Sequence, residues 1–104
     1  MEPIAFPAYI KDHEGKNFEL SKKTAKKIER YHGVKNAIDT VREILQSPDQ
    51  IYASSHSDDH YLYYKGYKNN AYYIVVVVDL SENRIDTAYV SNRIKKGEKI
   101  WPTS

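Results

Sequence analysis

YLYYKGYKNNAYYIVVVVDLSENRIDTAYV, residues 61–90, is the stretch that decides the fold class of this chain. Tyrosine and β-branched residues dominate it, and both types favour strands. Two short polar segments, at Asn69–Asn70 and around Asn83, have the composition of tight turns. They divide the stretch into predicted strands at 61–67, 72–79 and 84–90. The middle strand is continuously apolar from Ile74 to Val78, which predicts a central strand covered on both faces.

Two helices are predicted before these strands. The first has Ser21 as its N-cap and runs to about His32, and Gly33 follows in the left-handed conformation typical of a helix end. The second runs from about Val34 to Gln46, and Pro48 ends it because proline lacks a backbone N–H. Its apolar residues recur at helical spacing, at Val34, Ile38, Val41 and Leu45.

The remaining segments complete the predicted architecture. Residues 1–20 contain Pro3, Pro7 and Gly15 and predict an irregular region of short extended pieces and turns, and a short strand is expected from Ile51 to Ser54. Helices followed by an antiparallel meander predict an α+β fold. In it, two N-terminal helices pack on one face of a roughly four-stranded antiparallel sheet. With 104 residues, the range 1–104 has the size of one domain.

Composition excludes several classes of protein. The chain has no cysteine, which rules out disulfides and zinc sites built on thiolates. It has no phosphate-binding glycine loop, no dinucleotide fingerprint and no serine in a nucleophile-elbow context. No signal peptide is recognisable, and the longest apolar run is too short to span a bilayer. We therefore expect a cytoplasmic protein that binds no membrane and needs no cofactor.

Basic residues are concentrated in two places, although the net charge is only +2. On the first predicted helix, a stripe at spacings of four and three is formed by Lys23, Lys27 and Arg30. After the last predicted strand lie Arg93, Lys95, Lys96 and Lys99. Such clusters suit the phosphate backbone of a nucleic acid. An ordinary solvated surface is the alternative, and the sequence leaves both open.

The last predicted strand carries hydroxyl groups next to the second basic cluster. Strict alternation places Ile85, Thr87 and Tyr89 on one face. The other face then carries Asp86, Ala88 and Val90. Hydroxyls on a rigid strand beside cations are suited to bind phosphate oxygens. Threonine and tyrosine are also common in buried strands, so Thr87 and Tyr89 are either a functional pair or a packed one.

Two further positions have candidate chemistry. His32, at the end of the first helix, is either a capping residue or a general acid or base for RNA cleavage. Lys65 is the only cation inside the strand 61–67, on the same face as Tyr61 and Tyr63, and is either a phosphate ligand or an exposed lysine. His56 and His60 have H-x-x-x-H spacing, but the serines around them predict a loop, so we expect no metal site there.

The stretch YLYYKGYKNNAYYIVVVVDLSENRIDTAYVSNRIKKGEKIW, with ILQSPDQIY before it, resembles the phage and bacterial branch of the barnase–EndoU–colicin–RelE (BECR) superfamily of metal-independent ribonuclease folds. The resemblance covers roughly residues 24–101. It rests on the paired tyrosines before a cation, the valine-rich strand, Thr-Ala-Tyr and Lys-Gly-Glu…Trp. It implies two helices followed by a four-stranded antiparallel sheet, and cleavage or binding of RNA.

Position by position, the resemblance implies site roles for His32, Lys65, Thr87 and Tyr89. His32 matches the histidine of the family's Arg-His-Pro-Glu, but the chain has Tyr31-His32-Gly33-Val34 there. The family's histidine about five positions earlier is replaced near Lys27. These differences weaken the expectation of catalysis more than the expectation of the fold.

Two hypotheses follow. The first is a metal-independent RNase-like domain, a toxin or phage or genome-conflict effector that acts on tRNA or mRNA and has a cognate antitoxin or immunity protein. In it His32 is the acid or base, Lys65 stabilises the charge on phosphorus, and Thr87 and Tyr89 bind phosphate oxygens. The RNA backbone is contacted by Lys23, Lys27, Arg30, Arg93, Lys95 and Lys96. The second is a non-catalytic nucleic-acid-binding or protein-interaction module on the same fold.

Overall fold

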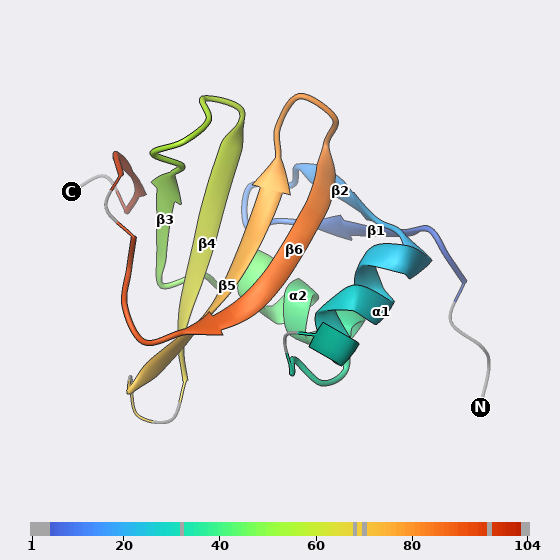
Figure 1. The fold of residues 1–104 in the computed structure, drawn as a ribbon. Coiled ribbons are helices and arrows are strands. Elements are labelled where there is room, and N and C mark those ends of the chain that lie inside the picture. The colour runs from blue at the N-terminus through green and yellow to red at the C-terminus, as the bar shows by residue number, and fades with distance from the viewer. Residues whose placement is uncertain (1–4, 32, 68, 70, 96, 103–104) are drawn as a thin grey trace.

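The computed structural model describes residues 5–31, 33–67, 69, 71–95 and 97–102. Within them the chain forms two helices and one seven-stranded sheet (Figure 1). In chain order the elements are β1 (Ala8–Lys11), β2 (Asn17–Leu20), α1 (Lys22–Tyr31), α2 (Ala37–Gln46), β3 (Gln50–Ala53), β4 (His60–Tyr67), β5 (Tyr72–Asp79), β6 (Arg84–Ser91) and β7 (Lys99–Trp101). The α+β class with a mostly antiparallel sheet agrees with the prediction.

The sheet is larger than the four strands expected. Its strand order is β1-β2-β6-β5-β4-β3-β7, so β5 is central, as its apolar sequence predicted. The region before Leu20 is not irregular: β1 and β2 form a hairpin, and β2 pairs in parallel with β6 through Glu19 and Arg84. At the other edge β7 pairs with β3. These added strands have three or four residues each, too few for a pattern of alternation to be recognised.

The helix ends follow from local chemistry. Ser21 is the N-cap of α1, since its Oγ accepts a hydrogen bond of 3.1 Å from the Thr24 N–H, and Gly33 has a φ of 68°. The second helix begins at Ala37 rather than at Val34, because Asn36 has left-handed angles that interrupt a helix. The first amide of α2 is instead bound by Glu29 of α1, whose Oε2 lies 2.9 Å from the Ala37 nitrogen. Neither helix is long and apolar enough to cross a membrane.

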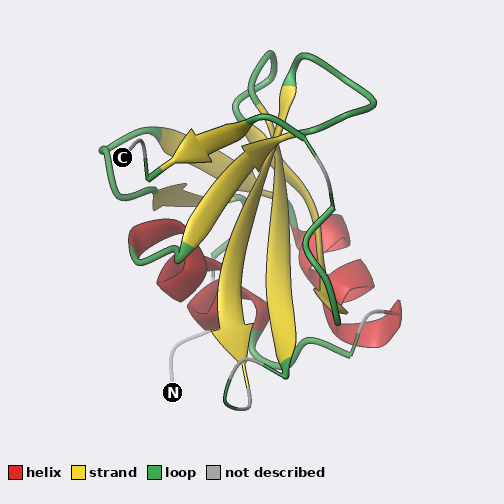
Figure 2. Ribbon diagram, turned by 90° about the vertical axis from the view of Figure 1, so that its left-hand side faces the viewer, coloured by secondary structure: helices red, strands yellow, loops and turns green. Residues whose placement is uncertain are grey.

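Hydrophobic residues pack on both faces of the sheet. On the first, which we call the helix face, both helices contribute to the main core, with Ile28 and Val41 beside Tyr63 and Val76. The opposite face, which we call the open face, carries a smaller cluster made of Leu62, Tyr64 and Val75, with Tyr52, Tyr73, Val77, Tyr89 and Ile94 packed against it. The strands fan out with a marked twist (Figure 2).

The segment that links β6 to β7 packs against the open face. It runs alongside the strands rather than away from them (Figures 1 and 2). Two backbone contacts hold it: the Lys95 N–H donates to the Tyr64 hydroxyl at 3.0 Å, and the Ala53 N–H donates to the Glu98 carbonyl at 2.8 Å. Hydrogen bonds therefore place Lys95 and Glu98 beside the sheet.

Candidate functional site

A β-bulge in β6 decides which side chains face the site. Val77 of β5 lies opposite Thr87, but the next residue, Val78, lies opposite Ile85, so Asp86 is an extra residue in β6. The bulge shifts the alternation by one position. Ile85 is therefore buried in the helix-face core, whereas Thr87 packs on the open face with its partner Val77. The prediction that Ile85, Thr87 and Tyr89 share one face was wrong for Ile85.

The open face is hollowed into two adjoining pockets. A pocket of about 230 Å³ is lined by Ala53, Ser54, Ser55, His56, Leu62, Val77, Thr87, Tyr89 and Lys95. A larger one of about 790 Å³ is lined by Ser55, His56, Tyr72, Val90, Ser91, Asn92, Arg93, Ile94 and Lys95. Ser55, His56 and Lys95 line both. We call the two together the open-face groove.

Thr87 is the most unusual residue in the groove. Its Oγ1 is buried, and among the described residues it has no hydrogen-bond partner. A buried hydroxyl without a partner costs on the order of 1–3 kcal/mol, so native structures rarely keep one without a reason. Because Thr87 lines the smaller pocket, a ligand oxygen bound there would satisfy this group.

Tyr89 and Lys95 lie beside Thr87 in the same pocket. The Lys95 ammonium is 5.5 Å from the centre of the Tyr89 ring, within the range of a cation–π contact. The backbone of Lys95 is fixed by Tyr64, and burial raises the pKa of that tyrosine, so its hydroxyl stays protonated at neutral pH. A cation is thus held by its backbone next to two strand hydroxyls.

His56 is the histidine that the structure brings to this groove. It is exposed on the loop between β3 and β4, and its backbone N–H donates to the Ser54 Oγ at 3.1 Å, which orders the loop. Sequence reasoning considered His56 only as a metal ligand. The pattern could not show its actual neighbours, because Thr87 is 31 residues away and reaches His56 only across the sheet.

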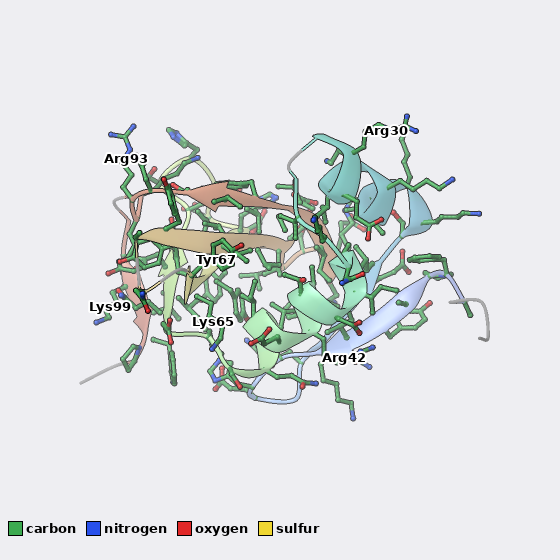
Figure 3. The ribbon with its side chains drawn as sticks, turned by 90° about the horizontal axis from the view of Figure 1, so that it is seen from below. Arg30, Arg42, Lys65, Tyr67, Arg93 and Lys99 are labelled. Carbon is green, nitrogen blue, oxygen red and sulfur yellow. The ribbon has the colours of Figure 1, made fainter. Side chains whose placement is uncertain are left out.

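Lys65 is not part of the groove. Alternation along β4 puts it on the same face as Tyr61 and Tyr63, which is the helix face. Its Nζ donates to the Ser47 carbonyl at 2.7 Å, at the C-terminal end of α2, where a cation is favourable. Figure 3 shows Lys65 near the end of α2 and Arg93 apart from it, at another corner of the molecule. The structure therefore separates Lys65 from Thr87 and Tyr89.

The other predicted site residues are divided between two places. Arg93 and Lys95 line the groove. Lys23 and Lys27 line another pocket, of about 440 Å³, between α1 and the start of β6, and Thr87 lines this pocket as well as the smaller pocket of the groove. The Lys27 Nζ donates to the Asp86 carbonyl at 3.2 Å. Arg30 lies at the end of the molecule away from Arg93 (Figure 3). His32 and Lys96 lie outside the described residues.

Comparison with known proteins adds no relative. No family model matches the chain, and no curated protein or solved structure is similar to it.

Proposed function

We propose that this protein binds RNA in the open-face groove and cleaves it without a metal ion. The observation that carries the proposal is the placement of Thr87. Its buried hydroxyl lacks a partner among the described residues, and it shares a pocket with Tyr89, His56 and Lys95. Hydroxyl donors, an imidazole and an ammonium around one small pocket are the groups that a phosphodiester needs.

The proposed reaction is transfer of the phosphoryl group to the neighbouring 2′-hydroxyl. A general base removes the proton of the 2′-oxygen as that oxygen attacks phosphorus, and a general acid protonates the 5′-oxygen as its bond to phosphorus breaks. We propose His56 for one of these roles, because it lines the pocket with Thr87 and Lys95. Lys95 neutralises the charge that develops on the phosphate, and Thr87 and Tyr89 donate to its non-bridging oxygens. His32, which the sequence predicts as an acid or base, lies outside the described residues and is given no role in the groove.

The larger pocket suits the rest of the RNA chain. Arg93 and Ser91 line it beyond Lys95, so a phosphate next to the one being cleaved would meet a second cation. Lys65 has no role in this form of the proposal, since it lies on the helix face. The α1 cations Lys23, Lys27 and Arg30 would attract RNA from a distance.

The resemblance of the sequence to the BECR superfamily also supports RNA cleavage as the function. We propose a toxin or phage or genome-conflict effector that acts in the cytoplasm and is held inactive by an antitoxin or immunity protein. An inhibitor that covers the groove would present carboxylates to Arg93 and Lys95, because those cations line its wider part.

The experiment is cleavage of end-labelled tRNA and total RNA by purified protein in excess EDTA. We expect fragments that end in 2′,3′-cyclic phosphate, and a loss of rate of about 100-fold or more in His56→Gln. Arg42→Ala is the matched control, since Arg42 is a partly exposed cation on α2, pairs with Asp39 and does not line the groove. No cleavage by the wild-type protein, or equal cleavage by His56→Gln, would contradict the proposal.

Binding without cleavage has a separate meaning. If RNA binds in a salt-dependent manner, Lys95→Ala weakens the binding and no fragments form, the protein is a non-catalytic RNA-binding module that uses the same groove. If RNA does not bind at low salt, the RNA proposal fails, and the groove is left for a protein partner.

A further inference from the structure

Three metal-ligand side chains meet at one end of the sheet, outside the lining of the open-face groove. They are His60 at the start of β4, Asp79 at the end of β5 and Asp86 at the bulge of β6. One donor atom from each lies within 4.8 Å of the others. The His60 Nε2 is 2.7 Å from the Asp86 Oδ2 and 3.8 Å from the Asp79 Oδ2. The 2.7 Å contact is a hydrogen bond in which the His60 Nε2–H donates to the Asp86 carboxylate, and a metal ion that replaced this proton would hold the two atoms slightly farther apart.

Neighbouring groups orient all three donors toward this point. The Ser57 Oγ lies 2.8 Å from the His60 Nδ1, and a hydroxyl can donate or accept there. When a metal ion takes the place of the Nε2 proton, Ser57 can therefore accept the Nδ1 proton and leave Nε2 as the ligand atom. The Asp79 Oδ1 accepts hydrogen bonds from Ser81 and from the Glu82 amide, which leaves Oδ2 to face His60. An imidazole held through its second nitrogen is the usual arrangement around a protein-bound metal.

The charge and exposure of the cluster also suit a cation. Two carboxylates, Asp79 and Asp86, face one imidazole there, and Asp79 is buried. The side chains of His60 and Asp86 are 26% and 31% exposed, which admits a water as a fourth ligand. Arg84 now balances the carboxylates, at 3.9 Å from Asp79 and 3.5 Å from Asp86, but its side chain is 57% exposed and free to turn toward solvent.

We propose that His60, Asp79 and Asp86 form a Zn²⁺ site that bridges strands β4, β5 and β6. One imidazole nitrogen, two carboxylate oxygens and a water give the tetrahedral N/O set that Zn²⁺ accepts. Mg²⁺ would bind more weakly, because it prefers an octahedron of oxygens to an imidazole ligand. The site is independent of the proposed RNA cleavage, whose test is made in EDTA.

The test is titration of metal-free protein with ZnCl₂ by calorimetry, repeated with Co²⁺ so that absorption reports the coordination geometry. We expect one Zn²⁺ per chain, no measurable Mg²⁺ binding, and a loss of affinity of about 100-fold or more in His60→Gln and in Asp86→Asn. Arg84→Ala keeps every ligand and removes the competing charge, so it should bind Zn²⁺ more tightly than the wild-type protein.

A second group of donors provides the control. Asp12, His13 and Glu14 also bring one ligand atom each within 4.8 Å of one another. Both Asp12 oxygens, however, already accept hydrogen bonds, Oδ2 from the Tyr63 hydroxyl and Oδ1 from two backbone amides. We expect His13→Gln to leave Zn²⁺ binding unchanged. The proposal is overturned if the wild-type protein binds no Zn²⁺, if binding survives in His60→Gln, or if Arg84→Ala weakens it.

Discussion

At the scale of single residues, the candidate site depends on Thr87, whose buried hydroxyl lowers the stability of the fold because it has no partner among the described residues. Thr87 and Tyr89 were predicted as a pair from residue type alone, because hydroxyls next to cations suit phosphate. Their shared face followed from alternation, since both lie on the same side of the bulge. The role of His56 could not be predicted in this way, since its neighbours come from other strands and from the segment after β6.

Thr87→Val tests whether that hydroxyl serves a ligand rather than the fold. Valine has nearly the same shape and favours strands, so removing a buried hydroxyl without a partner should raise the free energy of unfolding by about 1 kcal/mol. RNA cleavage should fall at the same time. Urea denaturation and the cleavage assay measure the two effects. A variant that is less stable than the wild-type protein would show that the hydroxyl has a structural partner.

The raised pKa of Tyr63 predicts a loss of stability at alkaline pH. Burial, and then its hydrogen bond of 2.8 Å to Asp12, raise the pKa of this tyrosine far above the ordinary value of 10.0. The folded protein therefore keeps the proton that the unfolded chain releases above pH 10. The free energy of unfolding should fall with rising pH, by up to about 1.4 kcal/mol per pH unit. Below pH 10, Tyr63 does not change how the free energy of unfolding depends on pH.

The measurement is urea denaturation between pH 9 and pH 11. Tyr63→Phe should be less stable at neutral pH, because Asp12 loses a donor, but its stability should decline less steeply above pH 10. Tyr9→Phe is the control, since Tyr9 is 63% exposed. Equal slopes for the wild-type protein and Tyr63→Phe would refute this explanation.

At the scale of elements, the bulge in β6 and the segment after β6 shape the groove more than the regular parts of the strands do. The long strands were predicted within one residue of their bounds, since each has seven or eight residues of clear pattern. The bulge at Asp86 could not be predicted, because nothing in Arg-Ile-Asp-Thr distinguishes a bulged strand from a regular one. The sequence identified the segment after β6 only as a basic cluster, because its hydrogen bonds to Tyr64 and Ala53 depend on partners far away in sequence.

Gly97 holds that segment close to β3. A Cβ at this position would collide with the backbone carbonyl of Ala53. Gly97→Ala should therefore push the segment away from the sheet, lower the free energy of unfolding by about 1–3 kcal/mol and weaken RNA binding. Gly15→Ala is a matched control: it meets no atom within 4 Å and costs about 1 kcal/mol through its φ of 86° alone.

Denaturation and RNA-binding titrations separate the two glycines. Both variants should be less stable than the wild-type protein, but only Gly97→Ala should bind RNA less well, because Gly15 lies in the turn between β1 and β2. Equal RNA binding by all three proteins would show that the segment does not shape the groove.

At the scale of the whole molecule, the two basic clusters that the sequence predicts to contact RNA lie in different places. Arg93 and Lys95 line the groove, whereas Arg30 projects at the other end of the molecule (Figure 3). The sequence predicted both clusters but not their separation, because the sheet order β1-β2-β6-β5-β4-β3-β7 decides where each one lies. Three of those strands were not foreseen as parts of the sheet.

The groove cations should contribute more to RNA affinity than the α1 cations. Each single-strand phosphate contact adds about 0.7 to the slope of log affinity against log salt, so Arg93→Ala with Lys95→Ala should reduce the slope by about 1.4. Lys23→Ala with Arg30→Ala should mainly slow association. Fluorescence anisotropy at salt concentrations from about 50 to about 300 mM measures the slopes. A larger effect from the α1 pair would place the RNA on that helix.

The most direct test of the account is to locate bound RNA by NMR. ¹⁵N-labelled protein is titrated with a 2′-O-methylated oligonucleotide, which lacks the attacking hydroxyl and so binds without being cleaved. The account predicts amide shifts at His56, Thr87, Tyr89 and Lys95, with none at Lys65 or Arg42 on the helix side. Shifts confined to α1 and α2, or no shifts at low salt, would contradict it.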